Sequence, residues 1–264
     1  MKKTDENKEF IDFIKKENKN NDAEIFNTFF KNEKIWIKKA RKTESSKLHR
    51  FYYVIFPFEI LIPVQNKTKD KAVLFETSKI EEFQTLNIHT PTVVFKNEEF
   101  FALKDCGKNI NSYIRKRDIT EEKMYYYLEK TIEELSKIHN SGNYHGGAQA
   151  RNFTYNNGIV CAIDLEDSFD ESIKLETLQF RDLILFLISL TKTRASFSLD
   201  YNRIIEYYIS LTKKKDVKLR LIKLSNKLSW FLYVCDIKFV NNLLGRDVKG
   251  FIKLFKTLLQ LKAS

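Results

Sequence analysis

The most informative segment of the sequence is "YHGGAQARNFTYNNGIVCAIDLED", residues 144–167. Its second half contains two short runs of β-branched and aromatic residues, 153–155 and 159–163, which flank the pair Asn157-Gly158. An Asn-Gly pair between such runs is the strongest short-range signal for a β-hairpin. We therefore predict a hairpin at this point in an otherwise helical region.

Two polar residues border this hairpin. Asn152 precedes the first strand, and Asp164 stands at the end of the second, twelve residues later. A hairpin of this length brings its two ends together, and Asn and Asp offer the oxygen ligands that Mg²⁺ prefers. We predict that Asn152 and Asp164 share a magnesium ion.

The composition indicates a globular, helix-rich protein. Of the 264 residues, 43% are hydrophobic and 14% aromatic, which is enough for a sizeable core. Only 7 Gly and 3 Pro leave little room for a turn-rich β architecture. Three widely separated cysteines favour neither a disulfide framework nor a zinc site, and they predict a reducing compartment: Cys106, Cys161 and Cys235. The N-terminus lacks an apolar signal core, and no stretch is long and apolar enough to span a membrane, so we expect a cytoplasmic protein.

The order of patterns predicts an α+β chain. Between about residues 25 and 103, β-branched and aromatic runs predict strands, among them 34–40, 52–64, 90–95 and 99–104. One amphipathic helix interrupts them, at 71–89, with Leu74, Phe75, Ile80, Phe83 and Leu86 at helical spacing. Beyond the polar run at 104–109, long apolar periods predict helices. The first of these begins after an N-cap at Thr120 and stops at Gly142.

These motifs together resemble the protein-kinase-like superfamily. The run "LSKIHNSGNYHGG", residues 135–147, is similar to the segment that leads into the catalytic loop of atypical kinases. The likeness covers about residues 28–195 and is closest in pattern to the bacterial lipopolysaccharide (Kdo/heptose) kinase-like and RIO-type branch. It implies a bilobal protein-kinase-like fold: a β-rich N-lobe at 1–103 with one helix, a hinge at 104–110 and a helical C-lobe at 111–264.

The resemblance also assigns residues that would bind the nucleotide. "EKIWIKKA", residues 33–40, resembles the strand that carries the phosphate-binding lysine, and alternation places Trp36 and Lys38 on one face, with Lys39 pointing away. Lys38 is then the candidate lysine, and Glu76 on the following helix is its partner. The adenine slot would be lined by the hinge residues Leu103, Lys104, Asp105, Cys106 and Gly107. Asp182, interpreted as a residue at a helix start, would brace the catalytic loop.

Two departures from the family pattern bear on catalysis. In the loop pattern H-R-D-x-x-x-x-N, the Asp acts as the base, but here Gly147 occupies that position between His145 and Asn152. The region before Lys38 contains no glycine, so the Gly-rich loop over the phosphates is absent. The neighbouring side chains offer several substitutes for the base or for a phosphoryl clamp, and the sequence leaves the choice open: His145, Gln149, Arg151, Glu166 and Asp167.

Charge gathers at the C-terminal end. The net charge is +11, and residues 203–264 hold 14 Lys/Arg against 4 Asp/Glu. Such a basic region attracts anionic lipid, phosphorylated glycolipid or nucleic acid, although without a reading motif nucleic acid is disfavoured. The last predicted helix, 250–262, carries an apolar stripe that suits either core packing or a membrane surface. The stripe consists of Phe251, Ile252, Leu254, Phe255, Leu258 and Leu259, beside Lys253, Lys256 and Lys262.

Two functions remain open at this point. The first is an atypical kinase that uses ATP and Mg²⁺ to phosphorylate a lipopolysaccharide-core sugar or another anionic glycolipid, at the inner face of the membrane. The alternative is a pseudokinase, a nucleotide-binding or empty scaffold that regulates a protein partner. Gly147 and the missing Gly-rich loop favour the second. The retention of Lys38, Glu76, Asn152 and Asp164 favours the first.

Overall fold

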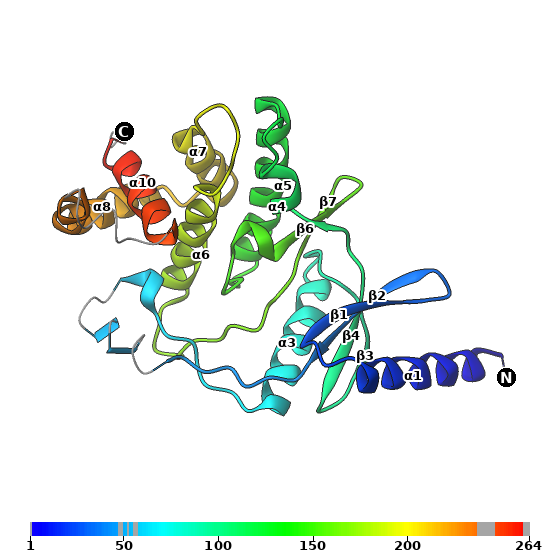
Figure 1. Cartoon of the computed structure of the whole chain (residues 1–264). Helices are drawn as coiled ribbons and strands as arrows, with labels where there is room; N and C mark the ends of the chain where they lie inside the picture. The colour runs from blue at the N-terminus through cyan, green and yellow to red at the C-terminus, as the bar shows by residue number, and fades with distance from the viewer. Residues whose placement is uncertain (1, 47–49, 52, 55–57, 237–245, 261–264) are drawn as a thin grey trace.

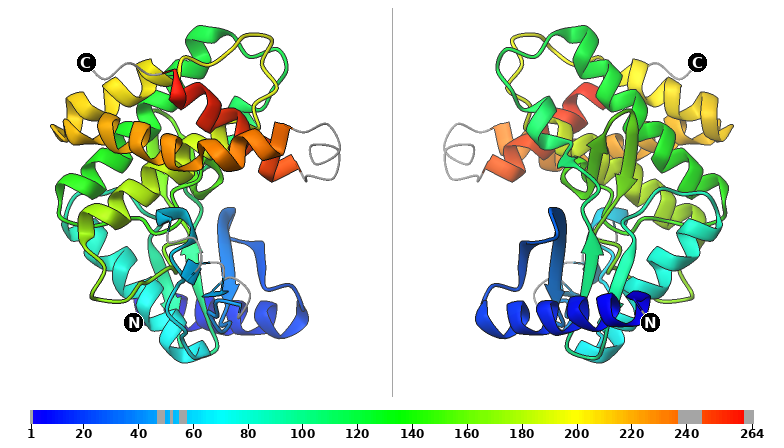
Figure 2. Two further views of the ribbon diagram at one scale, coloured as in Figure 1. Left: turned by 90° about the vertical axis from the view of Figure 1, so that its left-hand side faces the viewer. Right: turned by 90° about the vertical axis from the view of Figure 1, so that its right-hand side faces the viewer.

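The computed structural model describes residues 2–46, 50–51, 53–54, 58–236 and 246–260. It has two lobes, with a four-stranded sheet in the small lobe and a mainly helical large lobe (Figures 1 and 2). The predicted α+β class and bilobal arrangement are thereby confirmed. The small-lobe strands are antiparallel in the order β1-β2-β4-β3: β1 (Ile25–Phe30), β2 (Glu33–Lys39), β3 (Val93–Lys96) and β4 (Phe100–Lys104).

Two helices cover the sheet, one on each face. Helix α1 (Lys2–Asn20) packs on one face, where its Ile14 joins Phe26, Ile37 and Phe100 in a small apolar core. Helix α3 (Lys69–Thr85) lies on the other face (Figure 1). The predicted helix at 71–89 is therefore present, but it ends earlier, and its Leu74 and Leu86 are exposed. The face of α3 turned towards the protein instead buries two charged residues, Glu76 and Lys79.

The strand predicted at 52–64 is wrong for the part of that segment that the structure describes. Residues 58–64 contain only the 3-10 turn η1 (Glu59–Leu61). Residues 58–64 lie against the large lobe, where η1 packs against α6 and Ile62 against Phe169 and Leu178 (Figure 1). Pro63 has no N–H to donate to a strand ladder, so the apolar residues pack on helices instead.

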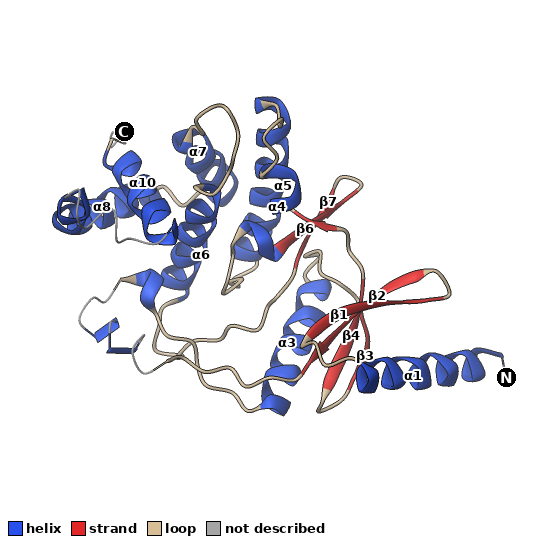
Figure 3. Ribbon diagram, in the orientation of Figure 1, coloured by secondary structure: helices blue, strands red, loops and turns tan. Residues whose placement is uncertain are grey.

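The large lobe contains the main core and a second, smaller sheet (Figure 3). The predicted hairpin is confirmed, with β6 paired to β7 around Asn157 and Gly158, both at positive φ. The predicted helices after it are also present, and Thr120 caps α5 as expected. The elements are β5 (Lys108–Asn109), α4 (Asn111–Ile114), α5 (Glu121–Asn140), η2 (Ala150–Asn152), β6 (Phe153–Asn156), β7 (Ile159–Ala162), α6 (Leu175–Leu190), α7 (Tyr201–Thr212), α8 (Asp216–Asp236) and α10 (Arg246–Leu259).

The apolar stripe of the last helix packs inside the large lobe. Ile252, Leu254, Phe255 and Leu258 are buried in the main core, so these four side chains do not face a membrane surface. Leu259 is partly exposed. Among the described residues, no helix combines the length and apolarity needed to cross a bilayer. Some predictions fall outside the side chains that the structure describes: those for Phe251, Lys253, Lys262 and Cys235.

Candidate functional site

Strand β2 delivers a lysine to the space between the lobes. Its alternation turns Ile35 and Ile37 towards α1, while Trp36 and Lys38 line a cavity on the opposite face. Lys38 is buried, with Nζ 2.8 Å from Glu76 Oε2 on α3 and 2.8 Å from Asp164 Oδ1 after β7. Lys39 points away, as predicted, and donates to the carbonyl of Asn21. The lysine thus joins three elements from both lobes.

The electrostatics of this group keep Lys38 protonated. Burial alone would lower the pKa of Lys38, but the carboxylates of Glu76, Asp164 and Glu166 raise it overall. Burial raises the pKa of Glu76 to about 7, although Lys38 opposes the shift. Burial also disfavours ionised Asp164, yet its pKa is lowered because Lys38 pairs with it. The carboxylates of Asp164 and Glu166 thus stand beside two cations, Lys38 and Arg41, while burial favours the protonated form of Glu76.

The two predicted metal ligands face the same cavity. Asn152 and Asp164 both line it, together with Lys38 and Glu76, in a volume of about 320 Å³. The side-chain amide of Asn152 donates to the carbonyl of Gly147 at 2.8 Å, so its nitrogen is engaged by the loop. Asp164 adopts a left-handed backbone, with φ of 61°. The described residues contain no cluster of three His, Cys, Asp or Glu that could hold a metal. One carboxylate and one amide nevertheless fit Mg²⁺ bound with phosphates, because this ion keeps few protein ligands.

The segment between the lobes lines the inner end of the cavity. Leu103, Lys104, Cys106 and Gly107 are among its lining residues. Asp105 is not: its carboxylate accepts a hydrogen bond from Trp36 Nε1 at 2.6 Å instead. Gly107 has φ of 105°, and a Cβ there would lie 2.3 Å from the carbonyl oxygen of Tyr155. Only glycine lets this segment run so close to β6.

Asp182 holds the loop that precedes the hairpin. It is fully buried and accepts the backbone N–H groups of His145 at 2.7 Å and Gly146 at 3.0 Å. Its carboxylate also contacts His139 Nε2 at 3.4 Å. The prediction that it stands at a helix start is wrong, because α6 begins at Leu175 and Asp182 lies in its middle. The hydrogen bonds, rather than the helix dipole, account for a buried aspartate here.

His145 is a neutral, buried part of the same loop. Burial lowers its pKa to about 4. Its Nδ1 accepts the N–H of Gly147 at 3.2 Å, and its Nε2 lies 3.4 Å from the carbonyl oxygen of Asn152. Both ring nitrogens are therefore engaged in supporting the loop.

The other substitutes predicted for the missing base lie in different surroundings. Glu166 forms ion pairs with Lys38 and Arg41. Arg151 is exposed beside the loop, and Gln149 is half-buried and bonds to its neighbours through its backbone. Asp167 packs against the backbone of Gly146 and Gly147.

Two functional candidates were missed from the sequence. Arg41 lines the cavity and bonds Glu166 across the lobes. Lys79 is buried one turn after Glu76 and donates to the carbonyl of His145 at 3.0 Å. The only sequence signal for Lys79 was its spacing from Glu76, which places both residues on one face of α3. That signal is hard to recognise in a sequence with so many lysines.

The elements that precede Lys38 differ from those that carry the Gly-rich loop in protein kinases. In protein kinases the phosphate-binding lysine lies on the third strand, after the strands that the Gly-rich loop connects. Here Lys38 lies on the second strand, β2, and the element that precedes β1 in the chain is the helix α1. The β1–β2 connection is a tight two-residue turn at Lys31 and Asn32, both with positive φ. The first glycine of the chain is Gly107.

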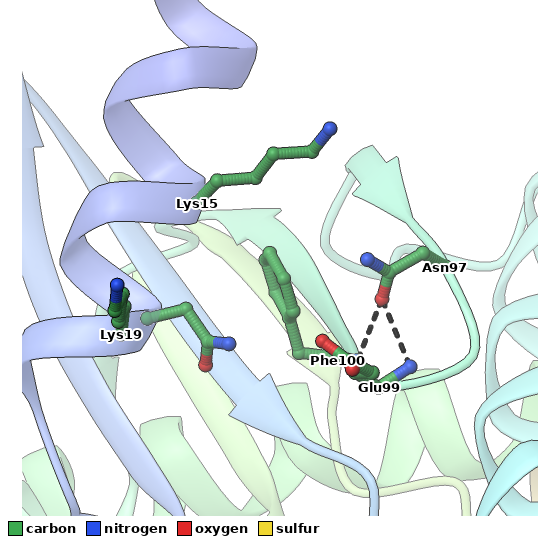
Figure 4. Close-up of a pocket in the computed structure, with 6 residues that line it drawn as sticks. Lys15, Lys19, Asn97, Glu99 and Phe100 are labelled. Atoms are coloured by element: carbon green, nitrogen blue, oxygen red, sulfur yellow. Dashed lines mark hydrogen bonds between the residues drawn. The ribbon is translucent and has the colours of Figure 1, made fainter.

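A second hollow lies on the α1 side of the sheet (Figure 4). It has a volume of about 510 Å³ and is lined by Lys15, Asn18, Lys19, Asn97, Glu99 and Phe100. The side chain of Asn97 is already used there, because its oxygen accepts the N–H groups of Glu99 and Phe100. None of the predicted site residues lines this hollow.

The cavity lined by Lys38, Glu76, Asn152 and Asp164 indicates the class of the fold. A strand lysine paired with a glutamate on the helix behind the sheet, above an Asn/Asp pair from a hairpin of the other lobe, is the arrangement of protein kinases. The chain thus has a bilobal protein-kinase-like fold.

The comparisons with known proteins leave the family open. No family model matches the chain. An uncharacterized protein of Haemophilus influenzae is 22% identical over 229 residues, covering 86% of this chain and 88% of that protein.

Two kinds of solved structure are similar to the chain. The ADP-bound aminoglycoside phosphotransferase APH(2'')-Ib has a TM-score of 0.36 at 12% identity, covering 94% of this chain and 96% of that one. The PAN3 pseudokinase of Neurospora crassa has a TM-score of 0.36 at 15% identity, covering 90% of this chain and 64% of that one. Both TM-scores are below 0.5, and the fold rests on the strand order and buried Lys–Glu pair of this chain itself.

Proposed function

We propose that this chain is a kinase-like phosphotransferase that uses ATP with Mg²⁺. The observation that supports it most is the buried contact of Lys38 with both Glu76 and Asp164, which come from different lobes. Buried ion pairs add little stability compared with well-packed apolar side chains. A scaffold that bound nothing would have no physical need for this group, whereas a nucleotide site needs a cation for phosphates and oxygens for a metal ion.

Each part of the cavity takes one part of the nucleotide in this proposal. We assign residues 1–103 to the N-lobe, 104–110 to the hinge and 111–264 to the C-lobe, with adenine against the hinge backbone. Lys38 contacts the α- and β-phosphates, and Glu76 orients Lys38. Asn152 and Asp164 hold Mg²⁺, which when bound neutralises charge that develops on the β- and γ-phosphates.

Arg41 is the proposed replacement for part of the Gly-rich loop. It lines the cavity and is partly exposed, with the guanidinium paired to Glu166. A planar guanidinium binds phosphate oxygens with two parallel hydrogen bonds. The γ-phosphate would draw Arg41 from Glu166 and so receive the contact that backbone N–H groups supply in protein kinases.

The acceptor we favour is a hydroxyl of an anionic glycolipid, such as a lipopolysaccharide-core sugar, reached at the inner face of the membrane. The net charge of +11 and exposed Arg151 beside the catalytic loop support an anionic acceptor. The apolar stripe of α10 is buried and cannot insert into a membrane, so attraction to the membrane surface would depend on charge. Binding to vesicles that contain anionic lipid should then weaken steeply as salt rises.

The pseudokinase remains the second candidate, and Gly147 is the observation that favours it. Calorimetric titration of the full chain with ATP, with and without Mg²⁺, tests the nucleotide site. We expect Mg²⁺-dependent binding that Asp164→Ala abolishes and that Asp170→Ala, an exposed change on the same segment, leaves intact. Absence of binding in the wild type would overturn the proposed function and leave an empty scaffold.

A further inference from the structure

We propose that Asp167 supplies the general base that Gly147 cannot, which rests on the proposed phosphotransferase function. A Cβ built on Gly147 would lie 3.6 Å from Asp167 Oδ2 and 3.3 Å from Asn152 Nδ2. An aspartate at position 147 would carry its carboxyl group one bond beyond that Cβ. The carboxylate of Asp167 therefore lies within a few ångströms of the point from which the carboxyl group of an aspartate at position 147 would extend.

The two glycines of the loop make room for this carboxylate. A Cβ on Gly146 would come within 2.9 Å of the Cβ of Asp167, and Gly146 has φ of 101°. A side chain at Gly146 would thus push Asp167 away. Gly147 lies outside the left-handed region, so its backbone accepts any residue, and the absence of a side chain there leaves space next to Asp167.

A segment from the small lobe holds the two residues that follow Asp167. Residues 58–68, here called the strap, run from the small lobe over the residues that follow Asp167. The N–H of Gln65 donates to the carbonyl of Ser168 at 2.8 Å, and Lys67 Nζ donates to Ser168 Oγ at 2.7 Å. Phe169 packs beneath the strap. Asp167 thus lies next to Gly146 on one side and is followed in the chain by two residues that the strap holds.

The charges around Asp167 suit a proton acceptor. Burial raises the pKa of its carboxyl group, Glu166 and Asp164 add to the rise, and Arg181 and Lys79 oppose it. A raised pKa strengthens a carboxylate as a base at neutral pH. The other substitutes are less suitable, because Glu166 is paired with two cations, both nitrogens of His145 are engaged, and Gln149 and Arg151 accept no proton.

The step that follows is balanced within ATP and the acceptor. The acceptor oxygen forms a bond to the γ-phosphorus, while the bond from that phosphorus to the β,γ-bridging oxygen breaks. ADP leaves with the electron pair of the broken bond. The proton of the acceptor hydroxyl passes to Asp167 Oδ2.

The test uses ATP hydrolysis, with water as the acceptor, by the full chain. Asp167→Asn should lower phosphate release about 100-fold or more, because general bases contribute on this scale. Its affinity for Mg²⁺·ATP should stay within about threefold. The double variant Asp167→Asn/Gly147→Asp returns a carboxylate to the same space and should regain at least about tenfold of the lost rate.

A second readout does not depend on activity. Gly147→Asp alone brings two carboxylates together and should lower Tm, and adding Asp167→Asn should restore part of the loss. Asp170→Asn, the same chemical change on an exposed neighbour, is the control for both readouts.

Several results would overturn the inference. The first is a wild type that binds Mg²⁺·ATP but releases phosphate no faster than Asp164→Ala does. This result would refute the role of Asp167 as a base and leave the nucleotide site in place. Loss of Mg²⁺·ATP binding in Asp167→Asn would reassign this residue to the metal. Equal rates of phosphate release by Asp167→Asn and Asp170→Asn would also contradict the inference about Asp167. If the wild type binds no nucleotide, the proposed phosphotransferase function itself is wrong.

Discussion

Lys79 makes the stability of this protein depend on pH in a measurable way. Its ammonium group is buried on α3, donates to the carbonyl of His145 at 3.0 Å and lies 4.2 Å from the ring centre of Tyr144. Burial lowers the pKa of Lys79 from 10.5 to about 8, although Asp182 and Asp167 oppose the shift. The residue connects α3 to the loop that precedes the hairpin, so its charge state matters to both.

The sign and size of the effect follow from the two pKa values. Above pH 10.5 Lys79 is neutral in both the folded and unfolded chain; as pH falls, the unfolded chain takes up the proton first and the folded protein loses stability. The loss is complete below about pH 8, where both states are protonated. At about 1.4 kcal/mol for each pKa unit, the charged form costs the folded state about 3 kcal/mol. Between about pH 7 and 9.5, Lys79 should therefore raise the free energy of unfolding by about 2 kcal/mol.

Urea denaturation followed by circular dichroism at several pH values measures this effect. Lys79→Met keeps most of the apolar stem and removes the titrating group. The wild type should gain about 2 kcal/mol relative to Lys79→Met between about pH 7 and 9.5, since other groups titrate equally in both proteins. The control Lys71→Met changes an exposed lysine of the same helix and should show a constant difference. A constant difference for Lys79→Met as well would refute the reasoning.

Two further predictions concern the loop and the segment between the lobes. Asp182→Ala leaves the N–H groups of His145 and Gly146 without their acceptor and should lower the free energy of unfolding by about 3–5 kcal/mol. Asp200→Ala removes only the N-cap of α7 and should cost about 1 kcal/mol, so equal losses in urea denaturation would count against the loop network. Gly107→Ala should cost clearly more than Gly142→Ala: both have positive φ, which alone costs about 1–2 kcal/mol, but only at Gly107 would the Cβ meet the backbone of Tyr155. Similar thermal shifts for the two glycine variants would show that the close approach to β6 is not tight.

Local sequence patterns predicted the features of the fold that depend on residues close together in the chain. Asn157-Gly158 fixed the hairpin, and strand alternation separated Lys38 from Lys39. Helical spacing predicted the helix that carries Glu76, whereas the pairing of Glu76 with Lys38 came from the resemblance to kinases. These features follow from the period of strands and helices, which the sequence displays directly.

Features that depend on long-range packing were not visible in the sequence. The apolar run at 52–64 reads as a strand, but its described residues pack on α6, because an apolar run does not say which surface it covers. Lys79 reads as one more surface lysine until the aromatic rings around it are known. Asp167 was one of several acidic or polar neighbours of the hairpin, and only the folded loop shows that its carboxylate lies next to the space at Gly147.

The most direct test of the nucleotide site is a crystal structure of the full chain with a non-hydrolysable ATP analogue and Mn²⁺ in place of Mg²⁺. The anomalous signal of Mn²⁺ should lie between Asn152 and Asp164, with the phosphates near Lys38 and the adenine against residues 103–107. Nucleotide bound in the hollow beside Lys15 and Lys19, or a metal peak away from Asp164, would contradict the account.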